Sequence, residues 1–302
     1  MHAVKVKIAH IWNNRTDMKN GMNLKSLTRY ILLGLSIALA PLRTVTAQSD
    51  PERVFQEKIK GNYGQKMGEI MKQITHTFLK TPYVAHTLEG NPEERLVCKF
   101  DGLDCTTLVE NVLALSLTYR EGGDYNRFRN ELTRIRYRNG KIDGYASRLH
   151  YFIDWMYENE KRGVIRDITA ELGGKPLEKE INFMTKHPNL YPSANSDEVW
   201  KKLKEREDSI NSRSYYFIPL AEIQSIEPKL NDGDIIGIAS TIDGLDCNHM
   251  GIVNKIGNRA YLLHASSVNK EVELSELPLH RYVAQNKKNR GIFVARPLDR
   301  EE

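Results

Sequence analysis

The stretch DGLDCTTLVENVLALSLTY, residues 101–119, decides the fold that we expect for this chain. It leads from a turn into a run whose apolar residues recur at helical spacing and form a broad face. A helix with so broad an apolar face is mostly buried. Asp104 is a suitable N-cap for it, which makes Cys105 the first residue of the helix.

The pentapeptide DGLDC occurs a second time, at residues 243–247. A cysteine attacks as its thiolate, which a helix N-terminus or a neighbouring imidazolium stabilises. Cys105 has a long helix behind it, whose dipole and unpaired amides favour the thiolate and can serve an oxyanion. Cys247 precedes a strand instead. We therefore predict that Cys105 is a nucleophile; the alternative is a buried structural thiol.

Four segments of the last third have the period of strands: residues 234–240, 249–256, 259–265 and 291–296. A turn at residues 257–258 joins the middle two into a hairpin. If Ile256 faces Arg259, His249 and His264 are diagonal neighbours; in the other register that the turn allows, the two histidines face each other directly. In either register one imidazole can act as a base while the other orients it.

Helical patterns come earlier in the chain and cover residues 52–80, 105–119, 125–136 and 152–161. Helices followed by an antiparallel sheet indicate an α+β fold. Residues 173–212 are polar and irregular to helical, and we expect them on the outside of the domain.

The N-terminal segment has the features of a leader. Basic residues precede the apolar run ILLGLSIALA (31–40), and VTA at residues 45–47 offers the small residues that a signal peptidase reads. The run is shorter than the roughly 20 residues of a membrane span. We expect residues 1–47 to be a leader that includes a signal peptide (22–47). The mature protein is then exported, periplasmic or extracellular, with no stable membrane anchor.

The net charge of +5 belongs to this leader. Residues 1–47 hold seven of the 44 Lys and Arg and one of the 39 Asp and Glu, so 37 basic and 38 acidic side chains remain. The mature chain therefore has a net charge of about −1, which argues against a nucleic-acid partner.

The three cysteines are Cys98, Cys105 and Cys247, and an odd number in an exported protein leaves at least one free thiol. A bridge between Cys98 and Cys247 would leave Cys105 free, although the sequence does not establish the pairing. Cys247, His249 and His264 could alternatively hold zinc, but their spacing fits no common zinc pattern. We expect no metal and no cofactor.

Three motifs together resemble the NlpC/P60 cell-wall cysteine hydrolases: TPY (81–83), DGLDCTTLVE (101–110) and HMGIVNKIGNRAYLLHASS (249–267). The stretch RYRNGKIDGYASRLHYFIDW (136–155) is similar to a divergent subgroup described as N-acetylmuramoyl-L-alanine-amidase-like. The resemblance implies a papain-like core, in which the nucleophile helix packs on an antiparallel sheet. It implies one catalytic domain, residues 48–302, with extra helical elements.

The same resemblance implies roles for five residues. Cys105 is the nucleophile, His249 the base and His264 the residue that orients it. Tyr83 matches a tyrosine near the oxyanion site, and Asp104 matches an acidic residue before the nucleophile.

The resemblance implies an amidase that cuts between muramic acid and L-alanine, in peptidoglycan or in soluble muropeptides, which would be its partners. Thr106-Thr107 stands where typical members have Ser-Gly, and this departure puts their usual γ-D-glutamate specificity in doubt. The alternatives are a γ-D-glutamyl–diamino acid endopeptidase and a non-catalytic peptidoglycan-binding protein. The oligomeric state stays open.

A turn-rich stretch supplies candidate substrate-binding residues, Tyr145, Ser147, Arg148 and His150. Muropeptides carry carboxylates, and a guanidinium binds a carboxylate through two parallel hydrogen bonds. We therefore predict that Arg148 binds the substrate; the alternative is a solvated loop.

Overall fold

The computed structural model describes residues 50–91 and 93–299. The chain divides into two units, Met1–Ala47 and Gln48–Glu302, and every described residue belongs to the second. The predicted leader and its signal peptide lie outside the described residues. Among the helices in the described ranges, none has the length and apolar character needed to cross a bilayer.

An antiparallel sheet forms the centre of the described unit, with the strand order β2-β3-β8-β4-β5-β6-β7 and with β1 pairing β8. The strands are β1 Ile165–Asp167, β2 Lys175–Pro176, β3 Tyr216–Pro219, β4 Ile235–Ser240, β5 Cys247–Ile256, β6 Arg259–Ser266, β7 Glu271–Leu274 and β8 Asn289–Pro297. The four strands expected from the sequence correspond to β4, β5, β6 and β8. Helices and this sheet together confirm the α+β class.

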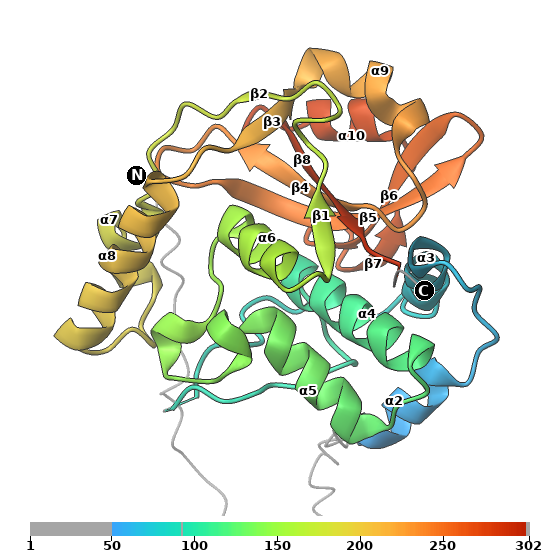
Figure 1. Cartoon of the computed structure of the whole chain (residues 1–302), viewed down its shortest axis with the longest axis horizontal. Coiled ribbons are helices and arrows are strands. Elements are labelled where there is room, and N and C mark those ends of the chain that lie inside the picture. The colour runs from blue at the N-terminus through green and yellow to red at the C-terminus, as the bar shows by residue number, and fades with distance from the viewer. Residues whose placement is uncertain (1–49, 92, 300–302) are drawn as a thin grey trace, which may run out of the picture. The chain divides into compact units, whose positions relative to one another are not determined.

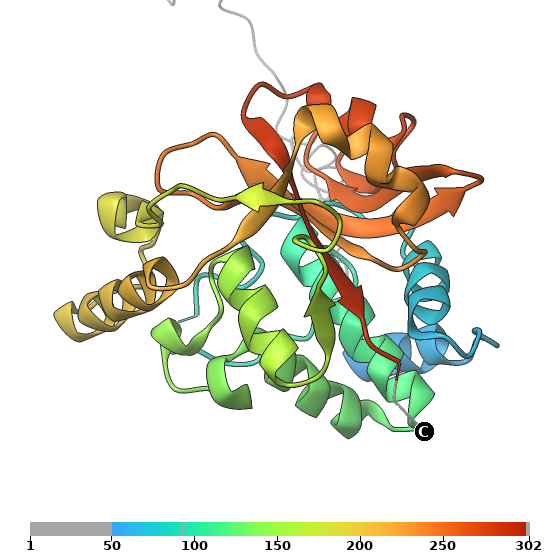
Figure 2. The same cartoon turned by 45° about the horizontal axis from the view of Figure 1, so that its top comes forward.

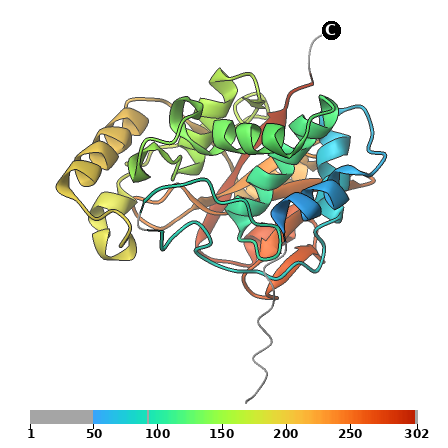
Figure 3. The same cartoon turned by 90° about the horizontal axis from the view of Figure 1, so that it is seen from below.

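Helices cover both faces of the sheet. The α-helices are α2 Pro51–Ile59, α3 Met67–His76, α4 Cys105–Arg120, α5 Tyr125–Arg136, α6 Phe152–Lys161, α7 Phe183–Lys186, α8 Asp197–Asn211, α9 Ile223–Ile226 and α10 Leu279–Ala284. In Figures 1 and 2, α4, α5 and α6 lie on one face and α9 and α10 on the other. Viewed from below in Figure 3, the layer of α5 and α6 lies in front of the strands.

Side chains alternate between the two faces because successive residues of a strand point in opposite directions. Ile235 packs into the core that contains α4, whereas Ile236 packs into the core that contains α9 and α10. Phe293 and Val294 divide between the two cores in the same way. The sheet is therefore buried on both faces.

Helix α4 is the most buried of the described α-helices, and every residue from 107 to 118 is buried. The predicted mostly buried helix is thus confirmed. It contains a charged residue, Glu110, whose carboxylate accepts from Nε of Arg136 on α5 at 2.7 Å. Buried charges are tolerated when they are paired in this way.

The single helix expected over residues 52–80 is wrong, because α2 and α3 are separate. Tyr63 folds back over Gly61, where a Cβ atom would overlap the tyrosine ring. The backbone amide of Tyr63 donates to the hydroxyl of Tyr119 on α4 at 3.1 Å. This tertiary contact holds the connection between α2 and α3 against α4. The short strands β1, β2, β3 and β7 were also not expected.

Candidate active site

A cavity of about 120 Å³ lies where the start of α4 meets β5 and the start of α6. Its lining residues are Cys105, Thr106, Leu149, His150, Phe152, Trp155, Leu245, Asp246, Cys247, Asn248, His249 and Met250. The predicted nucleophile and the predicted base therefore share one cavity. The sulfur of Cys105 is hydrogen-bonded by the backbone of Met250, the residue after His249.

A capping box fixes the first turn of α4. The carboxylate of Asp104 accepts from the amide of Thr107 at 2.8 Å, and the hydroxyl of Thr107 accepts from the amide of Asp104 at 3.0 Å. These bonds satisfy two amide groups that a helix start leaves unpaired. Asp104 therefore holds the helix start that carries Cys105, and Thr107 has a structural reason to stand where a glycine was expected.

Burial, and then the neighbouring Asp104 carboxylate, raise the pKa of the Cys105 thiol to about 11. Hydrogen bonds from the backbone of Met250 and from Thr106 oppose this pKa shift only in part. Burial therefore works against the thiolate that the helix start is expected to favour, and the thiol form is favoured near neutral pH.

His249 and His264 make direct contact. Nε2 of His249 lies 3.0 Å from Nδ1 of His264, and the rings meet at 90°. The hairpin pairs Ile256 with Arg259, which confirms the first of the two registers and the diagonal arrangement. The same register continued by one residue puts Gly251 opposite His264, and a Cβ atom at Gly251 would lie 2.7 Å from the carbonyl oxygen of Leu263.

Both imidazoles are neutral at neutral pH. Burial lowers the pKa of His249 to about 4. Burial, and then the neighbouring His249, lowers the pKa of His264 to about 3. A neutral imidazole offers one donor and one acceptor, so the pair can form a directed hydrogen bond.

Two further residues surround His264, and the sequence reasoning missed both. Glu273 faces it across β6 and β7, with Oε1 3.6 Å from Nε2. The hydroxyl of Tyr282 on α10 lies 3.5 Å from Nδ1, and the two rings are 4.9 Å apart. Nε2 of His264 is buried and has no hydrogen-bond partner among the described residues. The carboxylate of Glu273 is the acidic group that lies near this nitrogen. The alternating EVEL pattern of residues 271–274 was the available signal for Glu273.

Tyr83 lies beside Cys105. It forms a parallel bridge with Leu103, two residues before Cys105, and its amide donates to the carbonyl of Lys270 at 2.8 Å. Burial raises the pKa of Tyr83, with the neighbouring Cys105 as the next cause. Its role near an oxyanion stays a prediction.

The solvated-loop alternative for the turn-rich stretch is wrong, because Tyr145, Ser147 and Arg148 are buried. Nη2 of Arg148 binds Oε1 of Glu89 at 2.6 Å, and Nε lies 3.8 Å from Glu94. Arg148 does not line the cavity. Its guanidinium already has internal carboxylate partners, and its binding of a substrate stays a prediction.

The other members of this stretch divide between structure and site. Ser147 closes the turn, since its hydroxyl donates to the carbonyl of Gly144 at 2.7 Å. Tyr145 lines a separate surface pocket. His150 lines the cavity, and its Nε2 lies 3.0 Å from the carbonyl of Tyr145. Of the four residues, the structure brings only His150 together with Cys105.

The second DGLDC copy has a different role from the first. The buried carboxylate of Asp246 accepts from the amide of Ile153, in the first turn of α6, at 2.9 Å. Cys247 donates its thiol to the carbonyl of His249 at 3.0 Å. Burial raises the pKa of Asp246 to about 6 and that of Cys247 well above its ordinary value. This copy thus joins α6 to β5.

All three cysteines are free, so the Cys98–Cys247 bridge is not present. Within the described ranges, no group of three or more His, Cys, Asp and Glu side chains is arranged to hold a metal ion.

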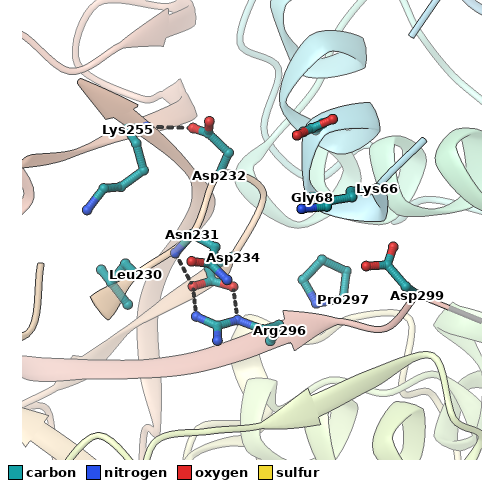
Figure 4. A pocket seen from close by; sticks show the side chains of 11 residues that line it. Lys66, Gly68, Leu230, Asn231, Asp232, Asp234, Lys255, Arg296, Pro297 and Asp299 are labelled. Carbon is teal, nitrogen blue, oxygen red and sulfur yellow. Dashed lines mark hydrogen bonds and ion pairs between the residues drawn. The ribbon is translucent and has the colours of Figure 1, made fainter. Parts of the chain in front are cut away.

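A larger pocket of about 410 Å³ lies away from these residues, between α3, β5 and β8. Figure 4 shows that two of its charged side chains, Arg296 and Asp234, bind each other. Arg296 forms two bonds of 2.8 Å to Asp234, and Asp232 accepts from the amide of Lys255 at 2.6 Å. It contains none of the predicted catalytic residues.

Comparison with known proteins agrees with the amidase expectation. The family model described as AmiA-like, N-acetylmuramoyl-L-alanine amidase-like, matches residues 73–292, and the chain belongs to this family. No curated protein matches the chain.

Solved structures give the same class of fold. An N-acetylmuramoyl-L-alanine amidase from Bacteroides uniformis is 41% identical, with a TM-score of 0.74 over 78% of this chain and 100% of that one. A Bacteroides fragilis protein, provisionally named as a xylanase, is 36% identical, with a TM-score of 0.69 over 74% and 98%. A Legionella pneumophila protein is 23% identical, with a TM-score of 0.61 over 84% and 95%, which is a likeness of fold.

Proposed function

We propose that this protein is an exported cysteine amidase that hydrolyses the N-acetylmuramoyl-L-alanine amide bond of peptidoglycan or of soluble muropeptides. The observation that carries the proposal is the shared cavity of Cys105 and His249, with His264 3.0 Å behind the base. A thiol, a base and a residue that orients the base are the parts that nucleophilic catalysis requires.

The direction of the histidine hydrogen bond follows from what each nitrogen must do. If Nε2 of His249 donates to Nδ1 of His264, Nδ1 of His249 is left without a proton and can act as the base. His264 then carries its proton on Nε2, the atom that faces Glu273 at 3.6 Å. An orienting carboxylate of this kind stabilises the imidazolium that forms during the reaction.

The reaction follows from the neutral resting state. His249 removes the thiol proton as the sulfur of Cys105 attacks the amide carbonyl carbon, and the start of α4 and Tyr83 are beside the developing oxyanion. His249 then gives the proton to the leaving amine, so the C–N bond breaks and a thioester remains. Water, deprotonated by His249, hydrolyses the thioester and releases a carboxylic acid and the free thiol.

The charge of the cavity favours this amide over the γ-D-glutamyl bond. None of the described residues that line it is a lysine or an arginine, and one, Asp246, is a carboxylic acid. D-Glutamate linked through its γ-carbonyl brings an α-carboxylate, which would enter without a cation to pair with. The acyl part of a muramoyl amide carries a neutral ether oxygen and a methyl group instead.

The same lining argues against glycoside hydrolysis, which the provisional name of one similar structure suggests. Most glycosidases use a pair of carboxyl groups on either side of the bond that they cut. Among the described residues that line the cavity, Asp246 is the one carboxylic acid, and it accepts from the amide of Ile153.

The test is mass spectrometry of a defined muropeptide after digestion. We expect a muramic acid with a free lactyl carboxylate and a peptide with a free L-alanine amine, and no such products with Cys105→Ala. Cys98→Ser is the matched control, since this thiol lies outside the cavity. A cut between D-glutamate and the diamino acid would contradict the assignment of the bond.

Export rests on the leader pattern of residues 1–47. N-terminal sequencing of the protein recovered from outside the cytoplasm tests it. We expect a new N-terminus close to residue 48, and an intact leader would contradict export.

A further inference from the structure

Trp155, the fourth residue of α6, has a hydrogen-bond donor that the fold does not use. The side chain is 2% exposed and lines the cavity that contains Cys105. Its indole Nε1 is buried and donates to none of the described residues. Among the described residues of the cavity wall, no other side chain has a buried polar atom without a partner. Buried donors almost always have acceptors, so this one needs an explanation.

The indole is held in place from several sides. Its ring stacks on Phe152 with centroids 5.8 Å apart. The ring of Phe152 packs in turn on Phe293 of β8, with 5.9 Å between the ring centroids. A Cβ atom at Gly237 of β4 would overlap the Phe152 ring, so the ring lies directly on that strand. The first turn of α6 is also held by Asp246. The donor is therefore fixed before a ligand arrives.

The surroundings select the kind of acceptor. An indole N–H is an uncharged donor and accepts nothing. The cavity wall offers no cation among its described residues, His249 is neutral, and Asp246 is acidic. A carboxylate ligand would be repelled there and left unpaired, whereas a carbonyl, ether or hydroxyl oxygen would satisfy the indole at no cost in charge.

We propose that Nε1 of Trp155 is a substrate-binding donor, which forms a hydrogen bond to a neutral oxygen of the substrate beside the bond that Cys105 attacks. The identity of the substrate as a muramoyl amide rests on the proposed function; the donor and its preference for an uncharged oxygen do not. The residue then contributes to specificity, because a site with an unmet donor disfavours ligands that lack the matching acceptor.

The first experiment observes the donor directly. The full chain has three tryptophans, so its ¹⁵N-labelled Cys105→Ala variant has three indole N–H signals, and Trp155→Phe in that background identifies one of them. The probe is N-acetylmuramoyl-L-alanyl-D-isoglutamine. We expect the Trp155 signal to move downfield and its exchange with solvent to slow, while the signal of Trp200 on α8 stays. An unmoved Trp155 signal at saturating probe would overturn the inference.

The second experiment measures the contribution to turnover. Trp155→Phe removes the N–H and keeps an aromatic ring, and we expect kcat/KM to fall by at least about tenfold. The rate of iodoacetamide labelling of Cys105 should not change, which a purely structural role would not predict. Trp200→Phe is the matched control and should leave kcat/KM unchanged. Unchanged kcat/KM in Trp155→Phe would mean that the indole binds only a buried water.

The outcomes separate this inference from the proposed function. Suppose that the wild-type protein releases a peptide with a free L-alanine amine, that Trp155→Phe is as active, and that the probe does not move the Trp155 signal of Cys105→Ala. The donor role of Trp155 is then wrong, and the proposed amidase activity is correct. If the probe moves the Trp155 signal but no muramoyl amide is cut, the donor role stands and the proposed reaction fails.

Discussion

His249 and His264 meet edge to face across neighbouring strands, with 3.0 Å between Nε2 of the first and Nδ1 of the second. The contact arises from the hairpin register, which places the two residues diagonally. Glu273 lies next to His264, so a line of contacts runs from Glu273 through His264 to His249, which lines the cavity of Cys105. We infer that this line of contacts holds His249 in one tautomer.

Replacing Glu273 with glutamine tests this line. The change removes the negative charge that faces Nε2 of His264 and weakens the preference for the required tautomer, so we expect kcat to fall about tenfold or more. Glu271→Gln is the matched control, because Glu271 lies on the same strand and pairs with Lys80 at the surface. Equal activity of Glu273→Gln and wild type would show that the carboxylate does not orient the histidine.

The pH profile should have a wide plateau. The proposed reactive form contains a neutral thiol and a neutral imidazole. Burial lowers the pKa of His249 to about 4 and raises the pKa of Cys105 to about 11, so this form persists between those values. We expect kcat/KM to be flat from about pH 5 to 9 and to fall toward about pH 4. Iodoacetamide labelling should instead rise through that range, because it follows the thiolate. Fast labelling at low pH would indicate a resting ion pair.

Acid should destabilise the fold through its buried imidazoles. The pKa of His264 is lowered from 6.5 to about 3. A group whose pKa is lowered by folding contributes stability above its unfolded value, and that contribution is lost as the pH falls toward the folded value. Between about pH 6.5 and 4 we expect the melting temperature to fall less steeply in His264→Gln than in wild type. Asp246, whose pKa is raised, acts in the opposite direction in both proteins. Identical slopes would contradict the assignment.

Arg148→Ala should act mainly on stability. The substitution leaves Glu89 and Glu94 without their buried cation, which costs about 3–5 kcal/mol in comparable cases. Arg166→Ala, which breaks an exposed pair with Glu171, should cost less than about 0.5 kcal/mol. Denaturant unfolding measures both variants. A stable Arg148→Ala protein with strongly reduced kcat/KM would instead support the sequence-based prediction that this guanidinium binds the substrate.

The parts of the site that the sequence predicted depend on local structure. Asp104 and Cys105 follow from a helix start, and His249 and His264 follow from a hairpin whose turn limits its register to two choices. The roles proposed for Trp155 and Glu273 depend on contacts with residues far away in the sequence. The hydrophobic period of a single segment does not reveal such contacts. Desolvation of Cys105 is likewise a tertiary effect, and the argument from the helix start did not include it.

The helices and strands likewise differ in how far the sequence predicted them. Long strands such as β5 and the long helix α4 have clear periods, whereas β2 and β7 are short and exist because neighbouring strands pair with them. The connection between α2 and α3 makes a tertiary contact, from Tyr63 to Tyr119, that the sequence pattern does not reveal. Arg148, which the sequence analysis predicted to bind the substrate, is buried and paired with Glu89 of a distant loop.

The most direct test of the central claim is the mass of the acyl-enzyme. A muramoyl-L-alanine substrate is mixed with the protein, the reaction is quenched with acid within its first turnover, and the peptides are examined by mass spectrometry. We predict a mass increase equal to the muramoyl acyl group on the peptide that contains Cys105, and none on the peptides of Cys98 or Cys247. An adduct on Cys247, or continued hydrolysis by Cys105→Ala, would contradict the proposed mechanism.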